Sequence, residues 1–207
     1  METVAVVLAA GAGKRLGDRA KASLLLPDGR TFLAAVAASA RAGGCHRVVV
    51  VVGRPHGHET RSAALAAGVT EVLENPDPDR GMGSSLAVAL DHLDPREVDV
   101  ALAWPVDHAC VRASTVEALL RVSGRDRIVV PTSARGRGGH PTAFGALLWP
   151  ELRQAADRPE GARAVVRADR SRVVRVTTSD PGAFFDVDTP ADLRGVRTGD
   201  TIGHRQT

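Results

Sequence analysis

A glycine-rich segment near the N-terminus is the first part of the chain whose residues could do chemistry. It runs Leu8-Ala9-Ala10-Gly11-Ala12-Gly13-Lys14-Arg15-Leu16-Gly17 and combines three glycines with two cations. Glycine lets the backbone approach a phosphate closely, and successive N–H groups can form an anion-binding nest. The segment lacks the ending of a Walker A loop, and Gly17 comes one place too late for G-x-G-x-x-G. It predicts a nucleotide-phosphate loop; the alternative is a glycine turn with solvated basic residues.

Lys21 follows this loop within a few residues, so its ammonium could reach the same phosphate oxygens. If it did not follow a candidate phosphate loop, Lys21 would be interpreted as an ordinary surface lysine. A second candidate loop, Asn75 to Ser85, precedes a predicted helix. The free N–H groups of a helix N-terminus, with the hydroxyls of Ser84 and Ser85 beside Gly81, could hydrogen-bond a base or a phosphate. The alternative is a capped helix with Ser84 or Ser85 as the N-cap residue.

Carboxylates appear at two places where apolar runs end. Asp107 follows a buried run, where a charge needs a partner to offset the loss of water. Mg²⁺ is such a partner, because it takes one or two carboxylates together with phosphate oxygens. Asp186 and Asp188 alternate with apolar residues, so both should point to one face of a predicted strand, and either could approach Asp107. Asp188 also suits the N-cap of a helix that begins at Pro190.

Weaker signals come from histidines and cysteines. His140 lies in a glycine-rich loop, which is more typical of a surface histidine than of a catalytic one. His56 and His58 have an H-x-H spacing, but nothing nearby completes a metal set. Two cysteines far apart, outside any CxxC, argue against a disulfide framework or a structural zinc site.

The elements that must position these residues alternate between strand and helix. Valine-rich apolar runs predict buried strands, and apolar residues at i, i+3, i+4 and i+7 predict helices. We expect strands at 3–9, 47–52, 69–73, 98–103, 127–130 and 142–144, closing strands at 172–176 and 184–187, and helices at 59–67, 114–122 and from 150 through 168 with a break at Pro159 and Gly161. Further helices are expected behind Thr31, behind the Asn75–Ser85 loop and from Pro190. This order predicts a single-domain α/β protein, a three-layer α/β/α sandwich with a mostly parallel, Rossmann-like sheet.

Composition excludes several classes of protein. The chain has 207 residues, of which 43% are hydrophobic and 25% charged, so it can bury a sizeable core and is not disordered. No apolar run approaches the ~20 residues that span a bilayer. Basic and acidic residues, 27 and 24, are interleaved, and only 3% of residues are aromatic, so we expect no nucleic-acid partner and no membrane partner. The N-terminus lacks a basic region and a cleavage site, which favours the cytoplasm.

Together the loops resemble those of MobA-like nucleotidyltransferases, and within them the molybdenum cofactor cytidylyltransferases. The resemblance covers roughly Val4 to Leu193. The family opens with L-A-A-G-x-G-x-R-x-G and a following lysine, matched by Leu8 through Gly17 and then Lys21. Further matches are Asn75 with Gly81-Met82-Gly83-Ser84-Ser85-Leu86, Asp107, Gly139-His140-Pro141, and the closing D-[IV]-D-T-P-x-D-L at Asp186 through Leu193.

The resemblance implies a nucleotide-diphospho-sugar transferase type of fold, with a MobA-like domain over 1–197 and a polar tail over 198–207. It implies that an NTP gives its nucleotidyl group to a phosphorylated acceptor, with molybdopterin suspected, and releases pyrophosphate. The guanylyltransferase branch has L-A-G-G where this chain has Leu8-Ala9-Ala10-Gly11, which favours CTP over GTP. A molybdoenzyme or maturation partner and a monomeric or homodimeric state are compatible with this view.

The resemblance also implies a role for each matched residue. Arg15, Lys21 and Asp107 would be catalytic, Asp107 and Asp188 would hold Mg²⁺ with Asp186 as the alternative ligand, and His140 would face the acceptor. The nucleotide would be bound by Leu8, Ala9, Ala10, Gly11, Gly13, Lys14, Asn75, Gly81, Ser84 and Ser85.

Three alternatives remain open at this stage. A sugar phosphate could replace the pterin acceptor. A G-x-G-x-x-x-G loop with Arg54 could instead bind NADP in an oxidoreductase, although this leaves Lys21 and the aspartates without a role. A non-catalytic nucleotide-binding module would bind nucleotide without releasing pyrophosphate.

Overall fold

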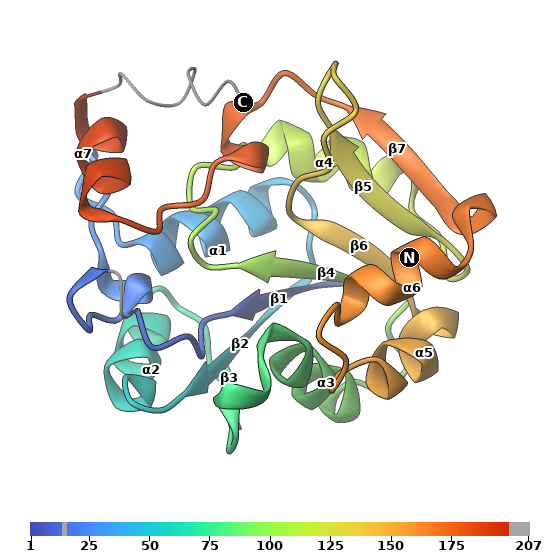
Figure 1. Cartoon of the computed structure of the whole chain (residues 1–207), viewed down its shortest axis with the longest axis horizontal. Coiled ribbons are helices and arrows are strands. Elements are labelled where there is room, and N and C mark those ends of the chain that lie inside the picture. Colours follow the sequence, from blue (N-terminus) through green and yellow to red (C-terminus); the bar gives the residue numbers. More distant parts are fainter. Residues whose placement is uncertain (14–15, 199–207) are drawn as a thin grey trace.

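One seven-stranded sheet organises the chain in the computed structural model, which describes residues 1–13 and 16–198 (Figure 1). The strands are β1 (Thr3–Leu8), β2 (Arg47–Gly53), β3 (Glu71–Asn75), β4 (Val100–Pro105), β5 (Ile128–Thr132), β6 (Thr142–Gly145) and β7 (Val173–Thr177). Their order across the sheet is β3-β2-β1-β4-β6-β5-β7. All neighbours are parallel except β6, which runs antiparallel to both β4 and β5.

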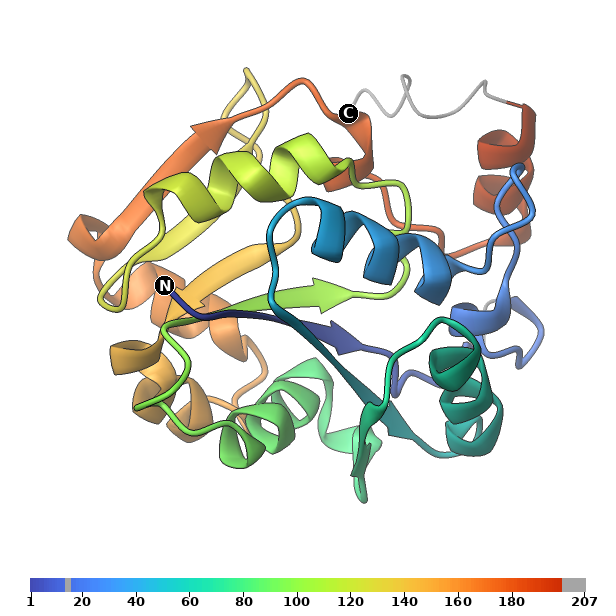
Figure 2. The same cartoon turned by 180° about the vertical axis from the view of Figure 1, so that it is seen from behind.

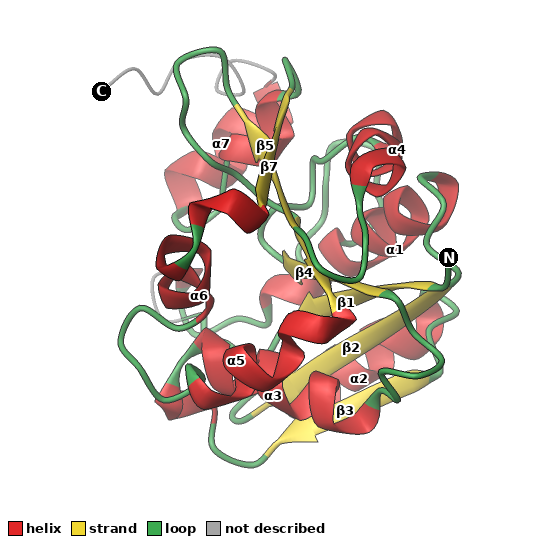
Figure 3. Ribbon diagram, turned by 90° about the vertical axis from the view of Figure 1, so that its right-hand side faces the viewer, coloured by secondary structure: helices red, strands yellow, loops and turns green. Residues whose placement is uncertain are grey.

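Helices cover both faces of the sheet. They are α1 (Phe32–Ala42), α2 (Gly57–Ala66), α3 (Met82–His92), α4 (Ala113–Val122), α5 (Trp149–Gln154), α6 (Ala162–Ala168) and α7 (Pro190–Thr198). One apolar core lies under α1, α2 and α4, and a second lies under α3, α5 and α6. Figure 2 shows α1 and α4 side by side on the first face, and Figure 3 shows the sheet edge-on between the two layers. The predicted three-layer α/β/α sandwich is confirmed.

The central strands are buried along their whole length, as the valine runs predict. Every residue of β1 and β4 is buried, and Val4 of β1 pairs with both Arg47 of β2 and Ala101 of β4. Thr31 caps α1, because its hydroxyl accepts a hydrogen bond from the Ala34 N–H at 3.1 Å. The predicted break at Pro159 and Gly161 separates α5 from α6. No helix in the described part of the chain is long and apolar enough to cross a bilayer.

The predicted strand at 184–187 is wrong. Asp180 accepts a hydrogen bond from the Gly182 N–H at 3.0 Å and caps a 3₁₀ turn over Pro181–Phe184. Proline supplies no backbone N–H for a ladder, so the turn replaces the start of the strand. The chain then crosses the edge of the sheet and donates a backbone hydrogen bond from Val187 to Asp107 O at 3.2 Å. Of the predicted tail, 198–207, only Thr198 lies within the described residues, as the end of α7.

Candidate active site

The centre of the site is an ion-paired cluster at the carboxyl edge of the sheet. Lys21 Nζ lies 2.8 Å from Asp107 Oδ2 and also contacts Asp188 Oδ1. The three side chains are largely shielded from water; Lys21 is only 17% exposed. The structure thus brings together the predicted catalytic lysine and both predicted metal ligands. A shielded carboxylate needs a partner to offset the loss of water, and in this structure the Lys21 ammonium is that partner of Asp107.

Electrostatics keep Lys21 charged. Burial alone would lower the pKa of its ammonium, but the charges and hydrogen bonds of Asp107 and then Asp188 outweigh this effect, and the net pKa lies above the ordinary value of 10.5. The cluster therefore holds one fixed positive charge between two carboxylates. When a substrate binds, the ammonium can pair with a phosphate and the two carboxylates can pair with a cation. No charge in the cluster is then left without a partner.

Three separate elements supply the cluster. Asp107 follows the carboxyl end of β4, Lys21 begins a 3₁₀ turn over Lys21–Ser23, and Asp188 comes just before α7. The predicted N-cap role of Asp188 is not what the structure shows. Thr189 forms a capping box with Asp192: the Thr189 hydroxyl accepts from the Asp192 N–H at 3.2 Å, and Asp192 accepts from the Thr189 N–H at 2.8 Å. Thr189 therefore takes the capping role, and the Asp188 carboxylate turns to Lys21.

Two features fix the course of the first loop. Gly13 has φ +62°, and a Cβ at this position would lie 2.1 Å from Arg19 O, so only glycine fits. His56 Nε2 donates a hydrogen bond to Ala12 O at 3.1 Å. Sequence reasoning missed this second contact, because it tested His56 only as a metal ligand. The predicted residues Lys14 and Arg15 lie outside the described residues.

A cavity of about 250 Å³ joins this loop to the cluster. Its walls are the end of β1 with the loop behind it, the N-terminus of α3, and the end of β4. Eight of the predicted site residues line it: Leu8, Ala9, Ala10, Gly11, Lys21, Gly81, Ser85 and Asp107. The remaining lining residues are Pro78, Met82, Pro105 and Val106. Ligands of open parallel sheets bind at this edge, beyond the carboxyl ends of the strands.

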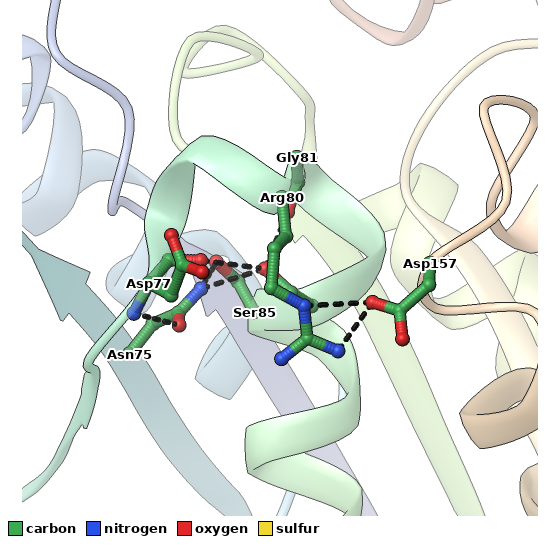
Figure 4. Close-up of polar contacts among 7 residues, drawn as sticks. Asn75, Asp77, Arg80, Gly81, Ser85 and Asp157 are labelled. Carbon is green, nitrogen blue, oxygen red and sulfur yellow. Dashed lines mark hydrogen bonds and ion pairs between the residues drawn. The ribbon is translucent and has the colours of Figure 1, made fainter.

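Behind the cavity, Asn75 fixes the start of α3 (Figure 4). Its amide nitrogen donates to the hydroxyls of Ser84 at 2.8 Å and Ser85 at 3.0 Å, and its Oδ1 accepts from the Asp77 N–H at 3.0 Å. Asn75 is only 1% exposed, and both serines are buried. Neither serine is the N-cap residue, since α3 begins behind Gly81. Asn75 and Ser84 thus support the wall of the cavity, and Ser85 also lines it.

A second cavity, of about 450 Å³, adjoins the first and shares Leu8, Gly81 and Met82 with it. Its outer rim is tied by Arg80, whose guanidinium contacts the Asp157 carboxylate, with Nε 2.7 Å from Oδ1 (Figure 4). This pair links the 3₁₀ turn Pro78–Arg80 to the segment between α5 and α6. Together the two cavities fall in the size range of small-molecule sites, roughly 300–1,000 Å³.

His140 lies in the wall of the second cavity rather than on a flexible surface loop. Its backbone N–H donates to Ala183 O at 2.8 Å, and a Cβ on Gly139 would lie 2.2 Å from the same oxygen. Its ring is 4.8 Å from the ring of His108, which sequence reasoning did not single out. Burial, followed by the nearby His108, lowers the pKa of His140 to about 4, so its imidazole is neutral at pH 7. Its Nδ1 is buried without a hydrogen-bond partner among the described residues.

Among the described residues, the carboxylates of Asp107 and Asp188 are the donors that the Lys21 cluster offers to a cation. Within residues 1–13 and 16–198 there is no group of three or more His, Cys, Asp or Glu side chains placed to hold a metal ion. Zinc, which prefers four nitrogen or sulfur ligands, does not fit this set. Mg²⁺ does fit, since it takes one or two carboxylates and completes its shell with phosphate oxygens and water. Asp186, the predicted alternative ligand, does not contribute to the Lys21 cluster in the structure.

Comparisons with known proteins agree with this architecture. The family model of the MobA-like NTP transferase domain matches residues 5–174. The chain is 35% identical to nicotine blue oxidoreductase of Paenarthrobacter nicotinovorans, over 89% of this chain and 91% of that protein. It is 32% identical to the bifunctional IPC transferase and DIPP synthase of Rubrobacter xylanophilus, over 92% of this chain but only half of that protein. The crystal structure of Rv0371c from Mycobacterium tuberculosis superposes with a TM-score of 0.76 at 29% identity, covering 95% of this chain and 98% of that one.

Fold and site together define the class: a nucleotidyltransferase-type α/β protein with its site at the carboxyl edge of the sheet. The chain belongs to the MobA-like NTP transferase family. The resemblance seen in the sequence is thereby confirmed at the level of the family.

Proposed function

We propose that the protein transfers a nucleotidyl group from an NTP, with CTP preferred over GTP, to the terminal phosphate of a small acceptor, for which we propose molybdopterin. An acceptor phosphate oxygen attacks the α-phosphorus, a new P–O bond forms, and the bond to the β-phosphate oxygen breaks as pyrophosphate leaves. The observation that carries the proposal is the contact of one ammonium, on Lys21, with both Asp107 and Asp188 beside the glycine-loop cavity.

In this mechanism the chain positions groups and neutralises charge. Backbone N–H groups of Gly11 to Gly13, with the side chains of Lys14 and Arg15, would hold the β- and γ-phosphates. Lys21 would stabilise the charge that develops on the α-phosphate. The Gly81–Ser85 turn, supported by Asn75, would contact the base, with Leu8, Ala9 and Ala10 on the opposite wall. His140 would face the acceptor from the second cavity.

Asp107 and Asp188 would hold Mg²⁺, in exchange for their ion pairs with Lys21. When bound, the cation would supply additional neutralisation of phosphate charge. A manganese complex of Rv0371c, 28% identical to this chain with a TM-score of 0.69, supports a divalent cation in a relative.

The preference for CTP and the pterin acceptor rest on sequence resemblance. Ala10 stands where the guanylyltransferase branch has glycine, and it lines the 250 Å³ cavity. We therefore expect an Ala10→Gly variant to use GTP better relative to CTP. A cytoplasmic location and a molybdoenzyme or maturation partner belong to the same proposal.

Pyrophosphate release tests the proposal. CTP and GTP are each combined with Mg²⁺ and with molybdopterin or a panel of sugar 1-phosphates, and Asp107→Ala is the control. Release with CTP and molybdopterin, abolished in Asp107→Ala, supports the proposal. Release with a sugar phosphate keeps the chemistry and replaces the acceptor. Near-normal release by Asp107→Ala would contradict the metal assignment.

A second candidate function is the reduction of an organic substrate with a nicotinamide cofactor. The observation that favours it is the 35% identical relative that is named an oxidoreductase. The loop geometry favours it less: in a dinucleotide fold the pyrophosphate rests on the helix directly behind the glycine loop, whereas the first α-helix described behind β1 begins at Phe32. NADPH binding tighter than CTP binding, with no pyrophosphate release from any NTP, would establish this second function.

A further inference from the structure

A third cavity, of about 460 Å³, is lined by arginines from three elements. Arg163 and Arg167 lie four residues apart on one face of α6, and Arg170 begins the 3₁₀ turn Arg170–Arg172 after the extended residue Asp169. Arg175 comes from β7, which belongs to the sheet that α6 covers (Figures 1 and 3). The other lining residues are Val130, Gly138, Gly139, His140, Thr142, Val166 and Val173, so no acidic residue lines this cavity.

The four guanidinium groups are not neutralised by the surrounding structure. Across the described ranges of the chain, none of their side chains forms an ion pair or a hydrogen bond. Of the nearby carboxylates, Arg172 engages two: it lies 3.3 Å from Asp169 and binds Glu151 at 2.6 and 2.9 Å. Glu160, three residues before Arg163, lines the adjoining 450 Å³ cavity. All four arginines are exposed, so solvent screens much of their mutual repulsion, and an anion in the cavity would relieve what remains.

The arginine cavity continues the proposed active site. It shares His140, Thr142, Arg163 and Val166 with the 450 Å³ cavity, which in turn shares Leu8 and Gly81 with the cavity beside Lys21. A molecule whose phosphate reaches Lys21 can therefore extend past His140 towards the arginines. The buried, unpartnered Nδ1 of His140 gives this junction a polar atom that the protein itself leaves unsatisfied.

We propose that the arginine cavity, lined by Arg163, Arg167, Arg170 and Arg175, binds a second anionic group of the acceptor, a phosphate or a carboxylate distinct from the phosphate that receives the nucleotidyl group. The inference rests on the proposed nucleotidyl transfer, and it narrows the acceptor. Molybdopterin carries one phosphate and no carboxylate, so use of this cavity requires an acceptor with two anionic groups in place of the pterin. Guanidinium groups suit both anions, because their planar donors pair with two oxygens at once. An anionic group held in this cavity, away from the reacting phosphate, would orient the acceptor for attack.

Calorimetry on the full chain tests this site separately from the nucleotide site. The protein is first saturated with Mg²⁺ and a non-hydrolysable CTP analogue with a methylene between the α- and β-phosphates, which fills the phosphate loop. It is then titrated with inorganic pyrophosphate in one arm and citrate in the other, which separates phosphate from carboxylate recognition. The variants are Arg167→Gln with Arg170→Gln on the α6 side and Arg175→Gln on β7. Arg121→Gln, an exposed arginine on α4, is the matched control.

We expect at least one of the two anions to bind the wild-type protein. Its affinity for the Arg167→Gln/Arg170→Gln variant and for the Arg175→Gln variant should be at least about tenfold lower. Binding to the control and binding of the analogue should be unchanged throughout. Equal anion binding by wild type and variants, or no anion binding while the analogue still binds, would overturn the arginine site and leave the proposed function standing. Arginine-dependent anion binding without analogue binding would support the site and contradict the proposed function. If neither molecule binds, both proposals fail.

Discussion

The ammonium of Lys21 lies 2.8 Å from the carboxylate of Asp107, although 86 positions of sequence separate the two residues. The contact joins the 3₁₀ turn behind the glycine loop to the end of the central strand β4. Asp188, 167 positions from Lys21, completes the cluster from the other end of the chain. The charge balance of the site thus depends on one lysine.

Removing that lysine should affect both stability and turnover. In Lys21→Met, two shielded carboxylates would share a site with no cation, so the free energy of unfolding at pH 7.5 should fall by about 1–3 kcal/mol. Turnover should fall about 10²- to 10³-fold. Urea unfolding and pyrophosphate release measure the two effects. Adding Asp107→Asn to Lys21→Met removes one of the two carboxylates and should restore part of the lost stability; an unchanged or larger deficit would argue against this cause.

Two matched variants decide the second metal ligand. Asp188 contacts Lys21, whereas Asp186 contributes no contact to the cluster. Asp188→Asn should therefore raise the Mg²⁺ concentration for half-maximal activity and reduce turnover about 100-fold, while Asp186→Asn should stay within about threefold of wild type. A Mg²⁺ titration of pyrophosphate release measures both. The reverse ranking would move the assignment to Asp186.

Asn75 should matter mainly for stability. Its side chain bonds both Ser84 and Ser85 and the Asp77 backbone in a buried position, so Asn75→Ala leaves polar groups unsatisfied. We expect a loss of about 2–3 kcal/mol in the free energy of unfolding. Ser85→Ala, which removes one of these hydrogen bonds, should cost about 1 kcal/mol. Equal losses in the two variants would show that the amide does not organise the turn.

Stability should depend on pH through His140. Its pKa falls from 6.5 in the unfolded chain to about 4 in the folded protein, so the unfolded chain binds the proton first as the pH drops. This contribution is fully present above about pH 6.5 and is lost as the pH falls towards 4. His140→Asn should reduce the loss of unfolding free energy between pH 7 and 5 by about 1–2 kcal/mol. Denaturant unfolding at the two pH values measures this; an unchanged difference would contradict it. Burial also lowers the pKa of His108, so part of the pH dependence of stability should remain in His140→Asn.

The Arg80–Asp157 pair should influence binding more than stability. Its side chains are 49% and 67% exposed, and such pairs contribute at most about 1 kcal/mol. Arg80→Gln should therefore leave thermal unfolding almost unchanged. Because the pair ties the rim of the 450 Å³ cavity, KM for the nucleotide or the acceptor should rise about three- to tenfold with kcat little changed. A large drop in melting temperature would show that the pair is structural.

The layers of the fold follow from local patterns. Runs such as the valines of β2 can be stable only when both faces are covered, and that requirement predicts a parallel sheet between helices. The segment at 184–187 is misleading because apolar and acidic residues alternate from Phe185 to Asp188, as they would in an edge strand. Its course is decided instead by Asp180 and Pro181, which start a turn just before it.

The site was predictable as a set of residues but not as a set of contacts. Motif order places Lys21, Asp107 and Asp188 at one edge of the sheet, yet nothing in their spacing shows that the lysine bridges the aspartates. The two glycines before His140 predict a surface position, and only the family resemblance implies that it faces the acceptor; the structure places it in a cavity wall. Its burial depends on His108 and Ala183, which are distant in sequence and carry no local signal.

β6 runs antiparallel to its neighbours, and this reversal brings the segment before it to the same edge of the sheet as the loops of the candidate site. That segment turns back on itself through a backbone hydrogen bond from Ser133 to Arg137 at 2.9 Å, and residues 134–138 are exposed. Insertions at this tip would lengthen the wall next to the arginine cavity without shifting the register of β5 or β6. The protein therefore has an exchangeable segment. If the proposed transfer holds, grafting longer tips here would change the acceptor range while the sheet and the glycine-rich loop stay unchanged.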